Sequence, residues 1–358
     1  MATDRPTPEN AEHPDGADAA QQAQLRQAAQ LIEAIMGQLY PAALHTAVRF
    51  RIPDLLAEHG PRTAGQLAAL ADLKEPNLYR ILRYLATREI FREDEQGRFH
   101  LTPMAEALRA DAQPPLRDFA MLLGDEMFWH PTIHLHETVR TGTPGFETAY
   151  GKTFFQHLSE VPEAAATFDA GMAGFSDLVN HAVAASYAFP PGATLADIGG
   201  GRGGLLRALL TADPVLNGVL YDLEHVVAGH RLDVPELKGR WRTEAGDFFT
   251  SVPEGCDVHL IKHVLHDWSD EDSARILRAS RRALPDHGRL LVVDAVLPRD
   301  NAPHPGKTID GLMMTLLEGK ERTREQFEEL FARSGYRLTR IVPTPSFACV
   351  VEAEPVAP

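Results

Sequence analysis

The chain has 358 residues, more than one hydrophobic core usually organises, so we expect a small domain beside a larger one. A formal net charge of -15 at pH 7 would repel the phosphate backbone of nucleic acid, so nucleic acid is not an expected partner. No apolar run is long enough to cross a bilayer, and the polar, acidic start of the chain lacks the pattern of a signal peptide. We therefore expect a globular, cytoplasmic protein with no membrane partner.

Cysteine and histidine usage gives no sign of a metal site. Cys256 and Cys349 lie far apart in the sequence, so neither a disulfide framework nor a cysteine-based metal site is expected. The 16 histidines show neither the HExxH spacing nor the CxxC…H spacing of common zinc sites. The sequence thus predicts a protein without a bound metal.

Composition and periodicity divide the chain into four segments. Residues 1–18 are rich in Pro, Asp, Glu and Ala without apolar periodicity, which predicts a mobile tail. Residues 19–111 carry the helices and the hairpin of a small domain. Residues 112–190 have the pattern of further helices, which we expect to bridge the two domains and to line a substrate pocket. Residues 191–358 alternate between strands and helices and are predicted to form the larger domain.

The small domain begins with a helix that needs a partner. Apolar residues recur at helical spacing over residues 25–39, so one face of this helix is strongly apolar. A helix capped by Thr63, a turn, a second helix from about Pro76 and a hairpin with its tip at residues 95–97 follow. This order is that of a winged helix-turn-helix.

The larger domain has the pattern of a doubly wound α/β sheet. A helix near residues 311–317 and another at residues 323–335 follow its first five strands. The chain then ends in two strands separated by a Pro-rich turn, and because no helix lies between them they are expected to pair antiparallel at an edge of the sheet. The expected strands are residues 193–198, 217–223, 239–245, 257–265, 288–297, 336–342 and 347–354.

A glycine-rich segment follows the first strand of the larger domain. The sequence LADIGGGRGG places an apolar strand ending at Ile198 before the glycines, and a helix just beyond them. Glycines there let the backbone turn tightly and approach a ligand without interference from a Cβ atom. About 20 residues on, the next strand ends at Asp222, whose carboxylate can accept hydrogen bonds from two ribose hydroxyls. Together these features predict a site for a cofactor that contains adenosine.

The spacing of the glycines separates two kinds of cofactor. Asp197 precedes glycines at alternate positions, with Gly199 and Gly201 the first two, and this DxGxGxG pattern differs from the GxGxxG pattern of dinucleotide sites. At the end of the third strand, Asp247 suits an adenine amino group and Phe248 suits the flat adenine face. A turn aspartate and a core phenylalanine would explain the same two residues, so both interpretations stay open.

The fourth strand ends in KHVLHDW, and open α/β sheets bind ligands at the carboxyl ends of their strands. A phenol or alcohol is a poor methyl acceptor until its proton leaves, and an imidazole titrating at about pH 6.5 can take that proton at neutral pH. His266 is the candidate general base, and Asp267, Asp294 and Glu321 are candidates to orient its ring. If HDWSDED only begins a helix capped by Ser269, the acidic residues are explained but His266 is not.

These motifs together resemble the small-molecule O-methyltransferases of the plant caffeic acid and isoflavone type and their actinobacterial natural-product relatives. The resemblance covers roughly residues 20–353 and adds GVLYDLEHV, GDFF and EGKERTREQFEEL to the segments above. It implies a Rossmann-like class I methyltransferase sheet, of α/β class, with an N-terminal winged-helix dimerisation domain. It also implies S-adenosylmethionine as cofactor, no metal, a homodimer formed through the N-terminal domain, and a small aromatic hydroxylated substrate.

The resemblance also assigns roles to individual residues. His266 matches the catalytic base, and Asp294 and Glu321 match its flanking acids. Lys262 would lie along the adenine edge, and Ser176 would reach the methionine end of the cofactor. The residues matched to the acceptor side are Met172 beside the acceptor ring, and Phe128 and Trp129 at the mouth of the pocket.

Three alternatives stay open at this point. A transcriptional regulator that senses a small molecule could contact DNA phosphates through Arg80, Arg83 and Arg88. An oxidoreductase could use the same sheet, although the alternating glycines disfavour it. A third alternative is an enzyme that keeps the cofactor but carries out hydroxylation or decarboxylation. The HDW motif with Asp294 and Glu321 favours methyl transfer.

Overall fold

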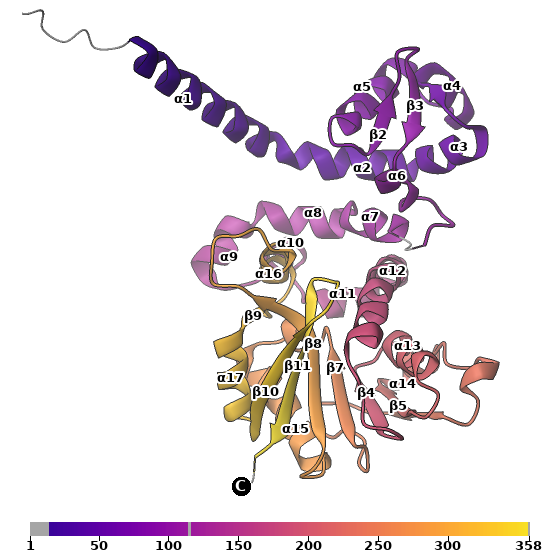
Figure 1. The fold of residues 1–358 in the computed structure, drawn as a ribbon, viewed down its shortest axis with the longest axis vertical. Helices are drawn as coiled ribbons and strands as arrows, with labels where there is room; N and C mark the ends of the chain where they lie inside the picture. The colour runs from indigo at the N-terminus through magenta and orange to yellow at the C-terminus, as the bar shows by residue number, and fades with distance from the viewer. Residues whose placement is uncertain (1–13, 114–115, 357–358) are drawn as a thin grey trace, which may run out of the picture.

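The computed structural model describes residues 14–113 and 116–356. A long first helix, α1 (Pro14–Ile35), extends away from the rest of the molecule, and a small N-terminal part lies above a larger α/β part (Figure 1). Helix α1 begins inside the predicted tail, so residues 14–18 are helical, in keeping with the Ala- and Gln-rich sequence around them. The rest of the predicted tail, residues 1–13, lies outside the described residues.

The small N-terminal part has its elements in the predicted order. The side chain of Thr63 accepts a hydrogen bond from the backbone of Gln66, whose side chain accepts one from Thr63 N, which fixes the start of α4. The hairpin turns at Gly97, which has a φ of 70°. Strand β1 joins this hairpin to give a sheet in the order β1-β3-β2. The elements are η1 (Met36–Gln38), α2 (Leu39–Arg49), α3 (Ile52–His59), β1 (Arg62–Thr63), α4 (Ala64–Ala71), α5 (Glu75–Ala86), β2 (Phe91–Glu93), β3 (Arg98–Leu101) and α6 (Pro103–Glu106).

Six helices connect the small part to the sheet. The longest, α12, precedes the first strand of the sheet. It packs against α7 and α13. Several of these helices build a separate aromatic core around Phe128, Phe146 and Phe154, to which Leu316 contributes from a later helix. The six helices are α7 (Arg117–Leu123), α8 (Glu126–Ile133), α9 (Leu135–Thr141), α10 (Gly145–Tyr150), α11 (Phe154–Glu160) and α12 (Pro162–Ser186).

The large part contains a mixed sheet in the order β10-β11-β8-β7-β4-β5-β6, with the short β9 paired to β8. The five strands from β8 to β6 are parallel, and β11 lies antiparallel between β8 and the edge strand β10. The closing antiparallel pair is therefore found at one edge of the sheet, as predicted. The strands are β4 (Thr194–Ile198), β5 (Asn217–Asp222), β6 (Trp241–Ala245), β7 (Val258–Lys262), β8 (Arg289–Leu297), β9 (Arg322–Thr323), β10 (Tyr336–Pro343) and β11 (Ala348–Pro355).

Helices cover both faces of this sheet, and each face has its own buried apolar core. Two predicted boundaries are wrong. The fourth strand, β7, ends at Lys262 rather than at residue 265, because the chain turns into a short 3-10 helix there. The helix expected near residues 311–317 begins earlier, at Pro305. The helical elements are α13 (Gly204–Ala212), α14 (Glu224–Val227), η2 (Pro235–Leu237), η3 (Leu265–Asp267), α15 (Asp270–Ala283), α16 (Pro305–Leu316) and α17 (Arg324–Ala332).

Within residues 14–113 and 116–356, none of the helices combines the length and the apolar character needed to cross a membrane.

Candidate active site

The predicted site residues gather at one edge of the sheet. Strands β4, β5, β7 and β8 are parallel neighbours, so their carboxyl ends lie at the same edge. Asp197 and the glycine loop follow β4, Asp222 ends β5, the segment from Lys262 to His266 follows β7, and Asp294 lies in β8. Sheet topology therefore brings together residues that are up to about 100 positions apart in the sequence.

The glycine loop needs its glycines for their backbone conformation. Gly199, Gly201 and Gly203 have φ values of 68°, 59° and 82°, which lie in the region that other residues rarely adopt. A Cβ atom on Gly199 would lie 2.7 Å from Cγ2 of Val264 and 3.5 Å from Cε1 of Phe248. The loop therefore lies directly against the segment that leads to His266.

Two acidic residues flank this loop. The carboxylate of Asp222 accepts hydrogen bonds from Gly201 N at 2.8 Å and from Leu223 N at 2.7 Å, so it is fixed against the loop. The carboxylate of Asp197 is buried, and neither of its oxygens has a hydrogen-bond partner among the described residues. Burial raises the pKa of Asp197 to about 6, although the positive charge of Lys262 opposes that shift.

Asp247 and Phe248 follow the end of β6. Asp247 Oδ1 accepts a hydrogen bond from Phe249 N at 2.9 Å, so this residue does shape a turn. Phe248 packs at the rim of the sheet core, with its ring 6.2 Å from that of Trp268, and faces Gly199. An aromatic side chain thus lies between the glycine loop and the segment after β7. Lys262 lies at the end of β7, where burial lowers its pKa.

His266 is held by a carboxylate from a distant part of the chain. Its Nδ1 lies 2.7 Å from Glu321 Oε1, a hydrogen-bond distance, and the histidine is buried to 9% exposure. Asp267 Oδ1 lies 3.5 Å from Nε2, and Asp294 Oδ1 lies 4.0 Å from Nδ1, beyond hydrogen-bond reach. Of the three acids that the sequence left open, Glu321 is therefore the one bonded to the ring. This contact leaves Nε2 as the ring nitrogen available to a substrate.

The electrostatics of this cluster favour a proton on His266. Burial lowers the pKa of His266, but the nearby carboxylates of Asp267, Asp294 and Glu321 outweigh burial and raise it to about 10. Burial raises the pKa of Asp267 to about 6 and that of Asp294 to about 7, against the attraction of His266. The cluster therefore favours a protonated imidazole facing carboxylates.

His263 is a further histidine in the cluster to which the sequence assigned no role. Its φ of 51° is unusual for a non-glycine residue, and its backbone N donates a hydrogen bond to Asp294 Oδ1 at 3.1 Å. The ring stacks on His266 at 5.2 Å and on Phe347 at 5.7 Å between centroids. Asp294 thus fixes the backbone after β7 instead of the His266 ring, and only the folded structure reveals this.

The residues matched to the acceptor side lie on the helices next to the sheet edge. Phe128 is buried in the aromatic core, its ring 6.0 Å from that of Phe154, and Met172 packs against the same core. Trp129 follows Phe128 on α8 and is half-buried. Ser176 lies on α12, next to Phe175, whose ring is 6.3 Å from that of His263. Helix α12 thus connects the acceptor side to the His266 cluster.

Metal binding and the DNA-contact alternative can also be compared with the structure. Within the part of the chain that the structure describes, no group of three or more His, Cys, Asp or Glu side chains is arranged to hold a metal ion. Two of the arginines considered for DNA, Arg83 on α5 and Arg88 just after it, contact other side chains of the protein. Arg88 pairs with Glu33 and lies 4.4 Å over the ring of Tyr84, and Arg83 lies 5.4 Å over the ring of Tyr79.

Comparison with protein families shows which family the chain belongs to. The family described as the O-methyltransferase domain matches residues 132–337, and the one described as the O-methyltransferase dimerisation domain matches residues 32–111. The chain belongs to the O-methyltransferase family. It is an S-adenosylmethionine-dependent enzyme, as the glycine loop and the resemblance predicted.

Relatives of similar length support this assignment. The phenazine O-methyltransferase PhzM of Lysobacter antibioticus is 40% identical over 91% of this chain and 96% of its own length. The O-demethylpuromycin-O-methyltransferase of Streptomyces alboniger is 37% identical over 96% of this chain and 93% of its own. Among solved structures, the S-adenosylhomocysteine-bound form of CalO1, a methyltransferase in calicheamicin biosynthesis, matches with a TM-score of 0.86 at 40% identity, covering 93% of this chain and 99% of CalO1.

Proposed function

We propose that this O-methyltransferase transfers the methyl group of S-adenosylmethionine to a hydroxyl of a small aromatic natural product, with His266 as general base. The observation that carries the proposal is the contact of 2.7 Å between His266 Nδ1 and Glu321 Oε1 at the sheet edge that also carries the glycine loop. A base oriented through one ring nitrogen leaves the other free to accept the proton of an acceptor hydroxyl.

The residues around the glycine loop suit the cofactor. Asp222, at the end of β5, would hold the ribose hydroxyls, and the unpartnered carboxylate of Asp197 suits a cationic group. Phe248 offers a ring to the adenine, with Asp247 beside it. When bound, S-adenosylmethionine supplies an electrophilic methyl group next to a positively charged sulfur.

Further cofactor roles are proposed for Gly199 and Gly201 in the loop, for Lys262 along the adenine edge and for Ser176 at the methionine end. The buried Lys262 lies near Asp197, so its charge is balanced locally. Ser176 lies on α12 next to Phe175, whose ring is 6.3 Å from that of His263, so this turn of the helix lies near the His266 cluster.

His266 has one main task in this mechanism, which is to remove the hydroxyl proton as the acceptor oxygen attacks. Nε2 takes the proton, and Glu321 stabilises the imidazolium that forms, with Asp294 adding negative charge at longer range. The surrounding helices exclude water and hold the oxygen near the methyl group, which supplies much of the rate acceleration.

An aromatic acceptor fits the surroundings of the site. Met172 and Phe128 belong to a core of stacked and edge-on rings that meets Trp268 through Phe155, at 6.0 Å between ring centroids. Trp129 would lie at the entrance. NcsB1, a structural relative at 33% identity and a TM-score of 0.73, was solved with 1,4-dihydroxy-2-naphthoic acid, which is a hydroxylated aromatic acid. We propose a ligand of this chemical class, and we propose that the N-terminal part forms a homodimer.

The test compares two variants in one set of assays. His266→Ala should lower turnover of a phenolic acceptor by about 100- to 10,000-fold and leave the affinity for S-adenosylhomocysteine within about twofold, because it removes only the base. Asp222→Ala should instead weaken S-adenosylhomocysteine binding by roughly 10- to 100-fold, which corresponds to the loss of about 1.5–3 kcal/mol from charge-assisted hydrogen bonds. Undiminished turnover in His266→Ala would overturn the base assignment.

Analysis of the reaction product tests the alternative that the enzyme keeps the cofactor but carries out hydroxylation or decarboxylation. Mass spectrometry of the acceptor should show a gain of one methyl group per cofactor consumed. An acceptor that gains oxygen or loses carbon dioxide would contradict the proposal.

A further inference from the structure

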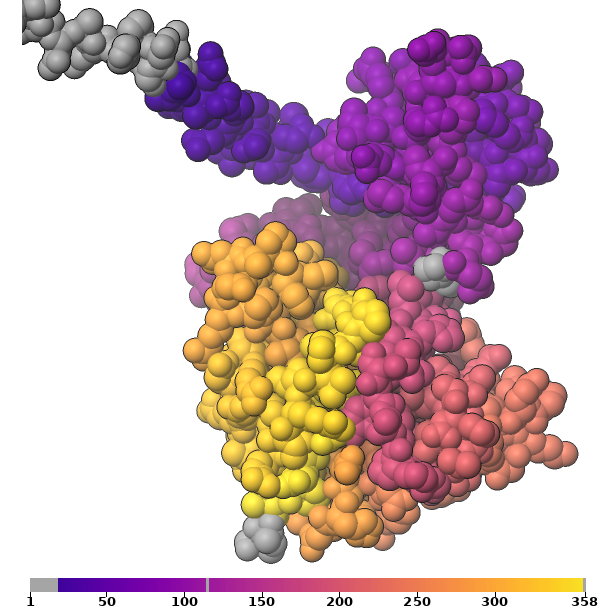
Figure 2. All heavy atoms as spheres, viewed as in Figure 1, coloured from indigo at the N-terminus to yellow at the C-terminus, as the bar shows by residue number. Residues whose placement is uncertain are grey.

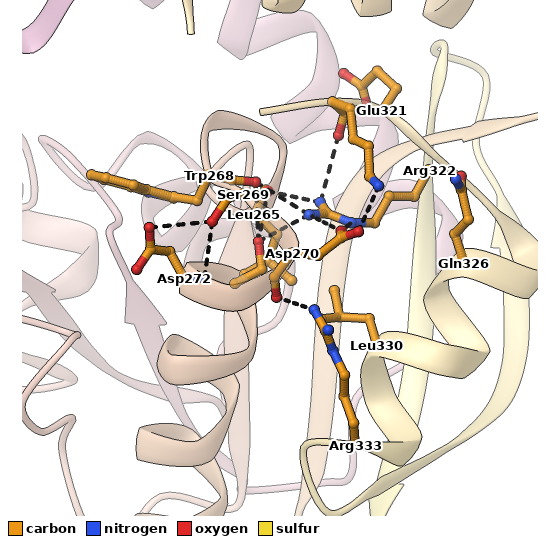
Figure 3. A network of polar contacts seen from close by, with 12 residues as sticks. Leu265, Trp268, Ser269, Asp270, Asp272, Glu321, Arg322, Gln326, Leu330 and Arg333 are labelled. Carbon is orange, nitrogen blue, oxygen red and sulfur yellow. Dashed lines mark hydrogen bonds and ion pairs between the residues drawn. The ribbon is translucent and has the colours of Figure 1, made fainter. Parts of the chain in front are cut away.

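Arg322, directly after Glu321, is a buried charge that the mechanism above does not use. Its side chain is 1% exposed. In Figure 3 it lies between the loop residues Leu265 and Trp268 and the first turn of α15, which Asp270 begins. A buried guanidinium is costly unless its N–H groups are paired, so its partners indicate what the residue does.

The guanidinium bonds to both ends of the short turn that carries His266. Nη1 donates to the carbonyl of Leu265 at 2.7 Å, and Nη2 donates to the carbonyl of Trp268 at 3.2 Å. Nε and Nη2 also donate to Asp270 Oδ1, at 3.0 and 2.9 Å. Since the guanidinium is a rigid plane, these bonds fix the distance between the two carbonyls that flank His266 and Asp267.

Neighbouring contacts reinforce this arrangement. Nη2 donates to Ser273 Oγ at 3.0 Å, and Ser273 Oγ in turn lies 3.1 Å from the Leu265 carbonyl. The strand β9 is anchored to the sheet, because Arg322 pairs in register with Val296 of β8. Arg322 is therefore fixed to the sheet, and Glu321 directly precedes it. Glu321 contacts the ring of His266, and Arg322 bonds the backbone on either side of it.

We propose that Arg322 is a positioning residue that sets the location of His266 by bonding the carbonyls of Leu265 and Trp268, while Glu321 sets the orientation of its ring. This inference rests on the proposed role of His266 as general base. A lysine could reach one carbonyl but lacks the planar fork that spans both.

Arg322→Met tests the inference, with Lys320→Met as the matched control. Lys320 bonds the same Asp270 at 2.5 Å through Oδ2 and is more exposed, so its loss removes an ion pair without freeing the two loop carbonyls. Arg322→Met should lower kcat by about 100-fold, the effect of a misplacement of about 1 Å, with KM and S-adenosylhomocysteine affinity changed by less than about threefold. Arg322→Lys should recover part of kcat, and Lys320→Met should leave kcat within about twofold.

A pH profile distinguishes positioning from general support of the fold. The carboxylates of Asp267, Asp294 and Glu321 raise the pKa of His266, and Glu321 does so through a direct contact. A His266 displaced from Glu321 should therefore have a lower pKa. The acidic limb of the kcat profile should therefore move to lower pH in Arg322→Lys, which keeps the positive charge near His266 and loses only the planar fork. An unmoved limb, or a loss of cofactor affinity as large as the loss of kcat, would overturn the inference.

A double variant separates this inference from the proposed function. If Arg322 acts through His266, adding Arg322→Met to His266→Ala should lower kcat no further. Full additivity of the two changes would refute positioning, whereas unimpaired turnover of His266→Ala alone would refute the base itself. Should Arg322→Met fail to fold, Asp270→Asn weakens the same anchor with Arg322 still present, and it should show a smaller loss of kcat with the same shift of the acidic limb.

Discussion

His266 combines two requirements that usually conflict. A general base must lose its proton before it can accept one, yet the carboxylates around His266 raise its pKa to about 10. A positive charge nearby lowers the pKa of a histidine, so a sulfonium cofactor would favour the neutral imidazole. The carboxylates then make the same imidazole a strong proton acceptor during the reaction.

Glu321→Gln tests the electrostatic role of the carboxylates around His266. Asp267, Asp294 and Glu321 together raise the pKa of His266, and glutamine at position 321 keeps the size of the side chain but removes one of these three charges. Since only the neutral imidazole acts as base, kcat rises as the pH increases through the pKa of His266, and in the variant this rise should occur at lower pH. The maximal kcat should fall by about 10- to 100-fold, because the imidazolium loses its counter-charge.

The measurement is the pH dependence of kcat with one acceptor for both enzymes, so that ionisation of the acceptor itself contributes equally. A rise at unchanged or higher pH in Glu321→Gln would contradict the role of Glu321.

At the scale of elements, the segment between α16 and α17 passes close to the backbone of the His266 turn at Gly319. A Cβ atom on Gly319 would lie 1.8 Å from the carbonyl oxygen of His266 and 2.5 Å from the carbonyl carbon of Asp267. Both neighbours are backbone atoms, so they cannot yield as a flexible side chain would. The absence of a side chain at this position therefore allows Glu321 and Arg322 to reach the turn.

Gly319→Ala should push this segment away from η3. We expect kcat to fall by about 100-fold, since a displacement of about 1 Å at a reacting group has an effect of that size. Gly311→Ala in α16 is the control, because a Cβ atom there would meet nothing within 4 Å. Steady-state kinetics of both variants measures kcat, and thermal melting confirms that both variants fold. Equal kcat values for the two variants would show that the close approach does not matter.

At the scale of the whole molecule, helix α1 has no partner within the described chain for its apolar side. Leu31, Ile32 and Ile35 are 62%, 56% and 69% exposed, and the helix projects from the body of the molecule (Figure 2). Such a surface is normally covered by another protein. The match to the O-methyltransferase dimerisation domain begins at residue 32, which makes a second copy of this chain the expected partner.

Ile32→Glu should weaken the dimer and leave the protomer folded. The side chain is exposed in the single chain, so the change costs the protomer little, whereas it would bury a charge in each of two symmetric contacts. We expect the dimer dissociation constant to rise at least about tenfold, which corresponds to about 1.4 kcal/mol. Gln30→Glu, on the opposite side of the same helix, is the control. Sedimentation at several concentrations measures the dimer dissociation constants of both variants. Equal dissociation constants would contradict a dimer contact at Ile32.

Local sequence determined the individual elements and much of the site chemistry. The capping box of Thr63 and Gln66 depends on residues three positions apart, and the positive φ of Gly199 and Gly201 is a property that the glycines themselves permit. The run from β4 to Asp222 likewise indicates a cofactor site through the spacing of its glycines and the carboxylate that follows them. Such features depend on short-range sterics and hydrogen bonds, which a sequence displays directly.

Tertiary structure decided which of these residues touch. Glu321 reaches His266 from 55 positions away, while the nearer candidate Asp267 lies at 3.5 Å and Asp294 bonds the backbone of His263 instead. The role of Arg322 was not visible in the sequence, because it depends on two carbonyl groups that carry no residue-specific signal. These contacts follow from strand order and from the pairing of β9 with β8, which long-range packing determines and local propensity does not.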